Sequence, residues 1–291
     1  HDIIAIKGAY HGDTFGSMSV GARSIFTDPF SQHLFKTHFI DFPEEGKEET
    51  VLDQFRKLVD TPSAGIFIYE PLIQGAAGMR IYKPEILDSL ISYARKKDII
   101  CIADEVFTGF GRTGKYFASD YLSNKPDIIA LSKGLTGGTL PLGVTSCSQT
   151  IVSAFETSEI EKTFFHGHSY TANPLACSVA NKSYDLLTAD SCQAAIKRIS
   201  AQQHNFVIQL EHDPKIKSIK NLGTILSIEV KTPGKTSYTN ASRKKIYDYF
   251  LSKNILLRPL GNIIYVVPPY IITEEQLSEV HSAIKHFLKS L

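Results

Sequence analysis

Short apolar runs alternate with amphipathic helical patterns in the first half of the chain, and this alternation limits the possible folds most strongly. The runs have the length and composition of buried strands and fall at Ile3–Ile6, Phe39–Phe42, Gly65–Tyr69, Ile99–Ala103, Ile128–Leu131 and Gly143–Ser146. Strands separated by helical segments in this way are typical of βα units. We therefore predict an α/β fold with a mainly parallel sheet and flanking helices.

The segment after Lys83 illustrates the helices expected between these strands. Pro84 suits the first helical position, where the missing N–H costs nothing. Apolar residues then recur on one helical face, at Leu87, Leu90, Ile91 and Ala94. The basic residues at 95–97 would lie in the last turn, where they interact favourably with the helix dipole. This segment is therefore predicted to be an amphipathic helix that covers the sheet.

The last part of the chain has a different pattern. A long helical region is expected from Asn173-Pro174 to about His212, with a break near Asp190. Beyond it we predict strands at Gly223–Val230, Leu256–Arg258 and Ile263–Val267, a helix at Ala241–Ser252, and a final helix opened by the capping box Thr273–Gln276. The chain is thus expected to contain a large domain at residues 1–212 and a small α+β domain at residues 213–291.

The composition is that of an ordinary soluble protein, with 43% hydrophobic and 21% charged residues. A net charge of +1 gives no electrostatic reason to expect nucleic acid or an anionic membrane as partner. No apolar run approaches the length of about 18 residues that a membrane-spanning helix needs. The cysteines are scattered and form no CxxC motif, which favours a cytoplasmic location; they are Cys101, Cys147, Cys177 and Cys192.

The amino terminus enters a buried-type strand at once, since His1-Asp2 leads directly into Ile3–Ile6. A natural chain seldom begins inside its core. We therefore expect that a segment precedes His1 in the natural protein.

Two successive strand-like runs end in opposite charges. The run Ile99–Ala103 is followed by Asp104, and the run Ile128–Leu131 is followed by Ser132-Lys133 and a Gly-Gly turn. In open α/β sheets, ligands bind beyond the carboxyl ends of the strands. An anion and an amine placed there suit a pyridine aldehyde cofactor, with the lysine as an imine and the carboxylate on the ring nitrogen. Either residue alone would indicate only a helix-capping Asp or a surface Lys.

Four motifs extend this interpretation to a family. They are YEPLIQG at 69–75, ADEV at 103–106, TGFGRTG at 108–114 and Ser132-Lys133. Together they resemble the signature of class III aminotransferases, which are fold-type I enzymes that depend on pyridoxal 5'-phosphate. The similarity extends over nearly all of the chain. It implies a fold-type I architecture and an aminotransferase activity.

The resemblance assigns roles around the cofactor. It makes Lys133 the Schiff-base lysine and proton carrier, and Asp104 the partner of the pyridinium nitrogen. Tyr10 matches the aromatic residue that stacks on the cofactor and contacts the substrate, and His11 lies in the same cofactor-binding segment. Without the resemblance, Tyr10 would also suit a core aromatic residue at a strand end. Glu70 is expected near the floor of the active site.

Two features of the sequence indicate which branch of the family the chain resembles. Phe107 stands where many members that act on ω-amino acids have Gln, and Thr136 precedes the paired glycines of the loop after the lysine. The pattern is most similar to the branch that transfers an amino group from S-adenosylmethionine to 8-amino-7-oxononanoate, forming 7,8-diaminononanoate in biotin biosynthesis. The alternatives are an aminotransferase for ornithine or 4-aminobutyrate, and a non-catalytic fragment.

The same branch implies residues for the substrate. Arg258 would bind a substrate carboxylate through its planar fork of donors, and Arg112 and Tyr265 match positions near the substrate. Without the family context, Arg258 would be interpreted as a surface arginine before a proline turn.

A further segment matches one that crosses a dimer interface. Gly167, His168 and Ser169 correspond to residues that reach the cofactor phosphate of the neighbouring subunit, and Gly167 would also contact the substrate. Some relatives have Pro-Thr where this chain has His168-Ser169. A homodimer is therefore expected. By the same resemblance, a segment upstream of His1 would supply the turn that binds the phosphate, so the 291 residues alone are expected to form an incomplete enzyme.

Two other motifs point weakly to different chemistry. His166 and His168 have no carboxylate or cysteine partner at short spacing, so we expect no metal site. The glycines of residues 109–114 resemble a dinucleotide loop, but no acidic residue follows at the required distance.

Overall fold

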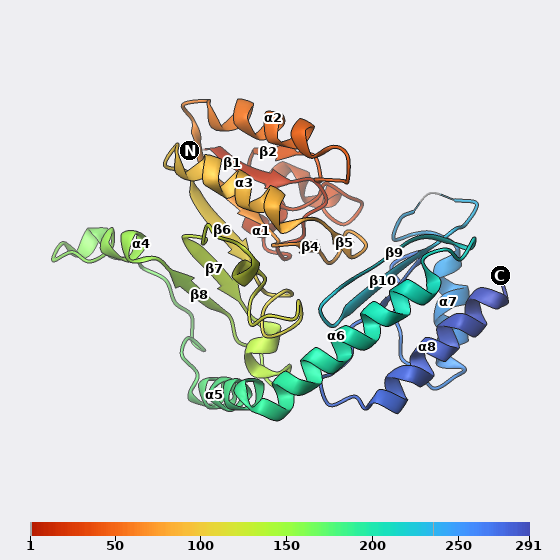
Figure 1. The fold of residues 1–291 in the computed structure, drawn as a ribbon. Coiled ribbons are helices and arrows are strands. Elements are labelled where there is room, and N and C mark those ends of the chain that lie inside the picture. Colours follow the sequence, from red (N-terminus) through yellow and green to blue (C-terminus); the bar gives the residue numbers. More distant parts are fainter. Residues whose placement is uncertain (1, 235) are drawn as a thin grey trace. The chain divides into compact units, whose positions relative to one another are not determined.

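The computed structural model describes residues 2–234 and 236–291 (Figure 1). The chain divides into two compact units. The first unit contains residues 1–73, 82–110 and 117–186, and the second contains residues 74–81, 111–116 and 187–291. The predicted boundary after residue 212 differs from this division, which begins the last segment of the second unit at Leu187. The domain limits at residues 1–212 and 213–291 stay a prediction.

A six-stranded sheet forms the centre of the first unit, with the strand order β2-β1-β3-β6-β7-β8. All neighbouring strands pair in parallel except β7 and β8, which are antiparallel. The strands are β1 (Asp2–Ile6), β2 (Thr37–Ile40), β3 (Ala64–Tyr69), β6 (Ile100–Asp104), β7 (Ile128–Leu131) and β8 (Val144–Cys147). The prediction of a mainly parallel sheet with flanking helices is confirmed, and each strand predicted for this sheet lies within two residues of its expected position.

The helices α2 (Glu48–Val59) and α3 (Pro84–Arg95) pack against each other in the first unit (Figure 1). Pro84 begins α3 as predicted, and the four apolar residues of its predicted face are all buried. Burying a leucine or isoleucine side chain stabilises a fold by about 1.5–3 kcal/mol as an upper estimate. The other helices of this unit are α1 (Phe15–Val20), α4 (Gln149–Ser153), α5 (Pro174–Thr188) and the 3-10 helices η1 (Asp28–His33), η2 (Ala118–Tyr121), η3 (Lys133–Thr136) and η4 (Ile160–Lys162).

An antiparallel sheet with the order β11-β10-β9 forms the second unit together with three helices. Its elements are β9 (Ile216–Leu222), β10 (Ile225–Val230), β11 (Ile263–Val266), α6 (Asp190–Leu210), α7 (Ser242–Leu251) and α8 (Glu274–Lys289). Ile199, Phe206 and Leu210 of α6 are buried in the same core as the sheet. This shared core explains why α6 groups with the second unit. A short pair of strands, β4 (Ile73–Gln74) and β5 (Arg80–Ile81), completes the described sheets.

The details of the second unit confirm some predictions and correct others. The helix break lies at Ala189, between α5 and α6, and Thr273 and Gln276 form the predicted capping box of α8. The predicted strand at Leu256–Arg258 is wrong, because this segment has no ladder pairing and the following Pro259 has no N–H to donate. Strand β9 was not predicted, because its lysines mask the apolar alternation. No helix within the described residues is both long enough and apolar enough to cross a membrane.

Candidate active site

Asp104 and Lys133 lie at the same edge of the six-stranded sheet. Asp104 is the last residue of β6, and Lys133 follows the end of the neighbouring parallel strand β7 by two residues. The main chain ties the two strand ends together, because Asp104 is paired with Ala130 and the N–H of Glu105 donates to the Ala130 carbonyl at 3.0 Å. The sheet therefore presents an anion and an amine from adjacent strand ends, which is where ligands bind in open α/β sheets.

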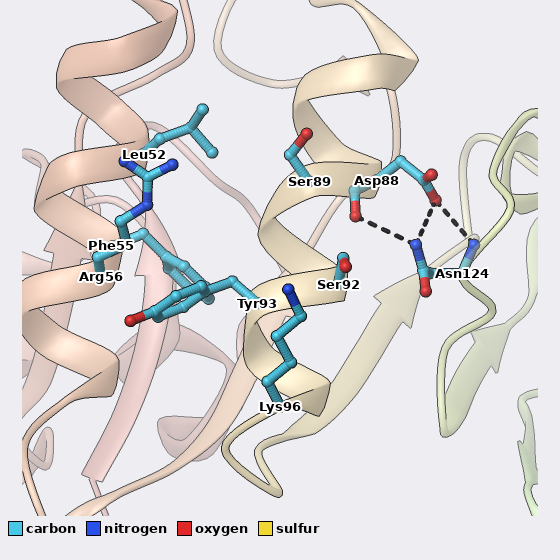
Figure 2. Close-up of a pocket in the computed structure, with 9 residues that line it drawn as sticks. All are labelled: Leu52, Phe55, Arg56, Asp88, Ser89, Ser92, Tyr93, Lys96 and Asn124. Carbon is cyan, nitrogen blue, oxygen red and sulfur yellow. Dashed lines mark hydrogen bonds between the residues drawn. The ribbon is translucent and has the colours of Figure 1, made fainter.

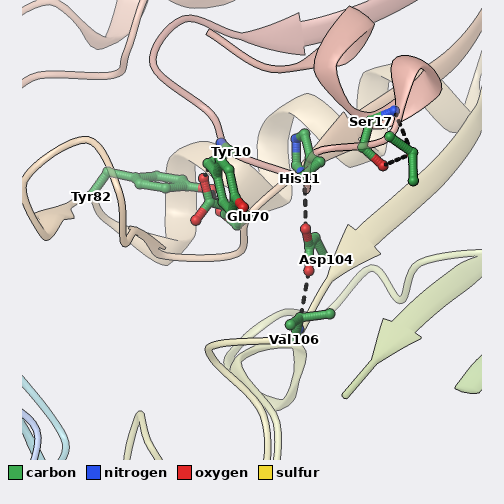
Figure 3. A network of polar contacts seen from close by, with 8 residues as sticks. Tyr10, His11, Ser17, Glu70, Tyr82, Asp104 and Val106 are labelled. Carbon is green, nitrogen blue, oxygen red and sulfur yellow. Dashed lines mark hydrogen bonds and ion pairs between the residues drawn. The ribbon is translucent and has the colours of Figure 1, made fainter. Parts of the chain in front are cut away.

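The Asp104 carboxylate is buried and held from both sides (Figure 3). Its Oδ2 lies 2.8 Å from Nδ1 of His11, and its Oδ1 accepts the Val106 N–H at 3.1 Å. An ionised carboxylate can only accept hydrogen bonds, so His11 must carry its proton on Nδ1 when Asp104 is charged. The contact fixes the His11 tautomer and holds the Asp104 carboxylate in place.

These residues fit a pyridine cofactor. The His11 side chain is 3% exposed, and its buried Nε2 has no hydrogen-bond partner among the described residues. Asp104 retains acceptor capacity beyond its two bonds, since a carboxylate offers about four lone-pair positions. A fixed, ionised carboxylate of this kind is the partner that keeps a pyridine nitrogen protonated. Asp104 would therefore hold the ring nitrogen.

Tyr10 follows β1 and presents its ring to solvent beside this network. The residue is 45% exposed, its N–H donates to Oε1 of Glu70 at 3.0 Å, and its hydroxyl donates to Asp13 at 2.9 Å. Glu70 is buried, and its carbonyl accepts the Tyr82 hydroxyl at 2.6 Å. Figure 3 shows Tyr10 and Glu70 side by side, with His11 and Asp104 adjacent. The backbone that carries Tyr10 is thus fixed while its ring stays available for stacking.

The backbone of Lys133 adopts an unusual conformation. Its φ angle is 46°, in the left-handed region that side chains other than Gly rarely occupy. Such residues persist only where the surroundings hold them, and they cluster at functional sites. Here the Ser132 hydroxyl donates to the Leu142 carbonyl at 2.7 Å, and the Gly138 N–H donates to the Lys133 carbonyl at 3.2 Å.

Aromatic side chains lie beside Lys133 and beside the glycine that follows it. Its Nζ lies 5.6 Å from the centroid of the Phe107 ring, within range of a cation–π contact. A Cβ on the next residue, Gly134, would lie 2.8 Å from the Phe110 side chain, so only glycine allows this approach. Phe107, which distinguishes the branch of the family, is thus also a neighbour of the lysine.

Glu105 is a structural anchor that the sequence reasoning did not single out. Its carboxylate is fully buried and accepts bonds from the Thr108 hydroxyl at 2.5 Å, the Ala118 N–H at 3.0 Å and the Ser119 N–H at 2.7 Å. Burial raises the pKa of Glu105, and these donors oppose that shift. The only sequence signal was its place next to Asp104. Glu105 ties the loop after β6 to η2 and so fixes the strand end that carries Asp104.

Three expected substrate residues lie in the second unit. Arg112 donates to the Pro268 carbonyl at 2.5 Å, and its guanidinium lies 4.6 Å from the centroid of the Tyr270 ring. Burial raises the pKa of Tyr265, and the nearby Arg258 opposes this shift. The structure thus brings Arg258 and Tyr265 into one neighbourhood, with Arg258 exposed.

The segment expected to reach a neighbouring subunit is exposed. Gly167, His168 and Ser169 all lie on the surface, and the described hydrogen bonds of this segment are local. The His168 N–H donates to the Thr171 hydroxyl at 2.8 Å. Within the described part of the chain, no hydrogen bond or ion pair joins these residues to Asp104 or Lys133.

A separate pocket of about 310 Å³ lies between α2 and α3 (Figure 2). Its charged side chains include Arg56, Asp88 and Lys96, and Asp88 accepts hydrogen bonds from Asn124. Arg56 pairs with Asp53 outside the pocket lining, and the pocket contains neither Asp104 nor Lys133. We assign it no role. No group of three or more His, Cys, Asp or Glu residues in the described ranges could hold a metal ion.

The fold and this strand-end pair define a pyridoxal-phosphate-dependent transaminase of fold type I. The chain belongs to the class III aminotransferase family, whose model matches residues 1–288. The expected family and cofactor are thereby confirmed.

Individual relatives agree with this assignment. The chain is 38% identical to the adenosylmethionine-8-amino-7-oxononanoate aminotransferase of Synechococcus elongatus, covering 99% of this chain and 69% of the relative. It is 35% identical to the enzyme of the same name from Helicobacter pylori, covering 99% of this chain and 67% of the relative. The crystal structure of the enzyme of that name from Methanocaldococcus jannaschii matches with a TM-score of 0.90 at 32% identity, over 99% of this chain and 68% of that chain.

A more distant likeness concerns the fold alone. An omega transaminase from Pseudomonas jessenii, solved in complex with PMP, matches with a TM-score of 0.90 at 22% identity, over 99% of this chain and 68% of that chain.

Proposed function

We propose that this chain carries out the transamination that moves the amino group of S-adenosylmethionine to the ketone of 8-amino-7-oxononanoate. The product is 7,8-diaminononanoate, an intermediate of biotin biosynthesis. The observation that carries the proposal is the pair Asp104 and Lys133 at adjacent strand ends, with Asp104 fixed by His11 at 2.8 Å. The names of the relatives described above supply the substrates.

Each residue of the strand-end centre has a distinct role in this proposal. When bound, pyridoxal phosphate supplies an electron sink for the reacting carbon. Asp104 holds the ring nitrogen protonated, His11 keeps Asp104 in place, and the exposed ring of Tyr10 stacks on the cofactor. Lys133 Nζ would anchor the cofactor until the substrate amine replaces it. The freed amine would then carry a proton between the amine-bearing carbon of the substrate and the cofactor, in opposite directions in the two half-reactions.

Residues of the second unit would recognise the substrate. Arg258 would bind the carboxylate, and Arg112 and Tyr265 would lie near the reacting molecule. The rigid planar fork of an arginine matches the two oxygens of a carboxylate. Arg112 is already held by Pro268 and Tyr270, which suits a residue that positions a substrate.

A homodimer with sites completed across the interface is part of the proposal. Strand β8 is exposed along its whole length, and the following segment exposes Phe155, Phe164, Phe165, Tyr170 and Leu175. Large exposed apolar patches mark interaction surfaces. Gly167, His168 and Ser169 of one subunit would then contact the cofactor phosphate of the other. The four free cysteines favour a reducing, cytoplasmic location.

Mixing two inactive variants tests the shared site. Lys133→Ala and Ser169→Ala would each lose activity as separate proteins. In mixed dimers, one of the two sites would contain both native residues, so activity should return to about a quarter of the wild-type value after random exchange of subunits. Lack of recovery in mixtures shown to exchange subunits would contradict the shared site.

A single half-reaction tests the substrate assignment. The loaded protein should convert its cofactor to the amine form with S-adenosylmethionine at least about tenfold faster than with ornithine or 4-aminobutyrate. The aminotransferases for these ω-amino acids form the alternative, and Phe107 beside Lys133 argues against them. A faster reaction with ornithine or 4-aminobutyrate would overturn the proposal in favour of that alternative. A protein that fails to bind the cofactor would instead be a non-catalytic fragment.

A further inference from the structure

A second cavity, of about 550 Å³, lies in the second unit and includes Arg258. The loop before α7, the first residues of α7 and the turn at Arg258-Pro259 line it. Its positive side chains are Arg243, Lys244 and Arg258, and no Asp or Glu is among the described residues of its wall. Its volume is in the range of small-molecule sites.

The two arginines of this cavity lack charge compensation from the chain. Lys244 pairs with Asp248 at 2.5 Å, whereas no carboxylate within residues 2–234 and 236–291 pairs with Arg243 or Arg258. Arg243 is half-buried, and its buried Nε has no hydrogen-bond partner among the described residues. Buried polar groups are normally satisfied, so an unsatisfied guanidinium N–H calls for an explanation.

Arg243 lies near the N-terminus of α7, where helices usually carry acidic rather than basic residues. It lies in the first turn together with Lys244 and Lys245, and that turn contains no acidic residue. The helix dipole places partial positive charge at this end, so cations there are unfavourable by about 0.3–1 kcal/mol each. The same partial charge and the first N–H groups of the helix favour an anion. A bound anion would reverse the unfavourable arrangement.

The segments that carry the arginines are held together. Gly261 has a φ of +64°, and a Cβ at this position would lie 1.8 Å from the carbonyl oxygen of Ser237. The turn after Arg258 therefore packs directly on the loop before α7, and only glycine permits it. Asn240 continues the loop into the helix, with its Oδ1 accepting the Ser242 N–H at 3.0 Å and its carbonyl accepting the Arg243 N–H at 3.0 Å.

Aromatic rings provide the remaining wall of the cavity. The Arg243 guanidinium lies 4.8 Å from the centroid of the Tyr238 ring, which fixes the plane of the donors. Tyr247 and Pro259 also line the cavity. These apolar faces can contact a methylene chain, while the two guanidinium groups face its charged end.

We propose that Arg243 and Arg258 jointly form a carboxylate pocket for a linear aliphatic acid, with Tyr238 and Tyr247 against its chain. The pocket extends the role proposed for Arg258 and rests on the proposed function for the identity of the acid, 8-amino-7-oxononanoate. Arg243 is then a residue that determines specificity for the carboxylate. A carboxylate bound by both guanidinium groups would supply the negative charge that neither arginine receives from the described residues.

Binding of nonanoate to the intact protein, measured by calorimetry, tests the pocket without any turnover. Nonanoate has the carboxylate and the chain but neither amine nor ketone. Arg243→Ala and Arg258→Ala should each raise its Kd about tenfold or more, and Arg243→Lys should recover part of the loss. Lys245→Ala is the matched control, because Lys245 lies in the same turn outside the cavity wall and should leave the Kd unchanged.

The alternatives to the pocket have distinct results. An unchanged Kd in Arg243→Ala would overturn the joint pocket, and so would equal affinity for neutral methyl nonanoate. Competition by inorganic phosphate at the same affinity as nonanoate would overturn the assignment of a carboxylate.

Kinetics separate the pocket from the proposed function. Arg243→Ala should raise KM for 8-amino-7-oxononanoate with little change in kcat, since the carboxylate is bound equally before and during the reaction. If the protein binds nonanoate through Arg243 but does not transaminate the oxo acid, the proposed function fails and the pocket stands. If it transaminates the oxo acid while Arg243→Ala changes neither Kd nor KM, the pocket fails and the function stands.

Discussion

Asp104 in the first unit and the arginines Arg243 and Arg258 in the second are the charged groups on which the two proposals depend. Asp104 is buried and receives two contacts from the chain itself, from His11 and from the Val106 N–H. The two arginines line an open cavity and have no carboxylate partner among the described residues. The chain thus supplies partners for the anion and leaves the cations to be satisfied from outside.

This difference matches the two roles that we propose, catalysis for Asp104 and substrate binding for the arginines. A centre that performs the same proton transfer for two substrates gains from groups fixed in advance, because fixed dipoles need no reorganisation during the reaction. A pocket that selects a substrate gains from groups left unsatisfied until the correct ligand arrives, because an uncharged analogue then leaves them unpaired. We expect variants in the first unit to change the rate and variants in the second to change the affinity.

Asp104→Asn should have the largest effect. It removes the charge that holds the ring nitrogen and leaves His11 without an ionised acceptor, so we expect kcat to fall on the order of 10³-fold. Steady-state kinetics with saturating cofactor measures the change. Asp53→Asn, on the exposed face of α2, is the control and should keep wild-type activity. Activity within a factor of three of wild type in Asp104→Asn would contradict the fixed-anion account.

Glu105→Ala should act on stability first. It leaves the Ala118 and Ser119 N–H groups without their acceptor in a buried position, so we expect the free energy of unfolding to fall by about 3 kcal/mol. Urea denaturation checks this value. Glu161→Ala, which removes an exposed carboxylate of the same unit, should change it by less than about 0.5 kcal/mol. An equal effect of the two changes would rule out the anchor role of Glu105.

Gly134→Ala tests whether the backbone beside Lys133 must keep its position for catalysis. The added methyl would lie 2.8 Å from Phe110, so the backbone beside Lys133 must shift. A strain of about 2 kcal/mol at this point should lower kcat roughly thirtyfold. Gly143→Ala adds the same atom where the nearest neighbour lies at 3.9 Å, and it should be nearly neutral in the same assay. Equal kinetics for the two variants would show that the lysine tolerates movement.

The smallest effect concerns a buried histidine of the second unit. His281 Nε2 lies 2.9 Å from Gln203 Oε1, and burial together with Lys285 lowers the pKa of His281 from 6.5 to about 4. Between these pH values the unfolded chain binds more protons, so stability is lost as pH falls below about 6.5. We expect up to about 2 kcal/mol of this loss between pH 7 and pH 5.

The His281→Gln variant isolates the contribution of His281 to the pH dependence of stability, because a glutamine side chain does not titrate. Its unfolding free energy should depend less on pH across that range than that of wild type. His212→Gln removes a histidine whose side chain is 93% exposed and should retain the wild-type pH dependence. A His281→Gln curve parallel to wild type would exclude His281 as the source.

The fold was largely predictable because its strands are buried on both faces and appear as continuous apolar runs. Strand β9 was missed and a strand at Leu256–Arg258 was wrongly expected, because in the second unit charged surface residues and a following proline decide the pairing. Local pattern does not contain that information. Patterns with strong local causes, such as the capping box at Thr273, were found.

The candidate site was predictable in its residues and less so in its contacts. The strand-end positions of Asp104 and Lys133 follow from the order of the strands. The contact between His11 and Asp104 joins residues 93 positions apart, and the link from Glu105 to Ser119 depends on how a loop folds back. Arg243 had no motif to identify it, because its meaning comes only from the cavity it shares with Arg258.

The central claim is that Lys133, at the strand end beside Asp104, holds the cofactor. Adding pyridoxal phosphate to the intact protein and recording the absorbance spectrum tests it most directly. Wild type and the exposed control Lys182→Ala should develop the band of the lysine-bound cofactor. Lys133→Ala should show only the spectrum of free pyridoxal phosphate. The same band in Lys133→Ala would contradict the account.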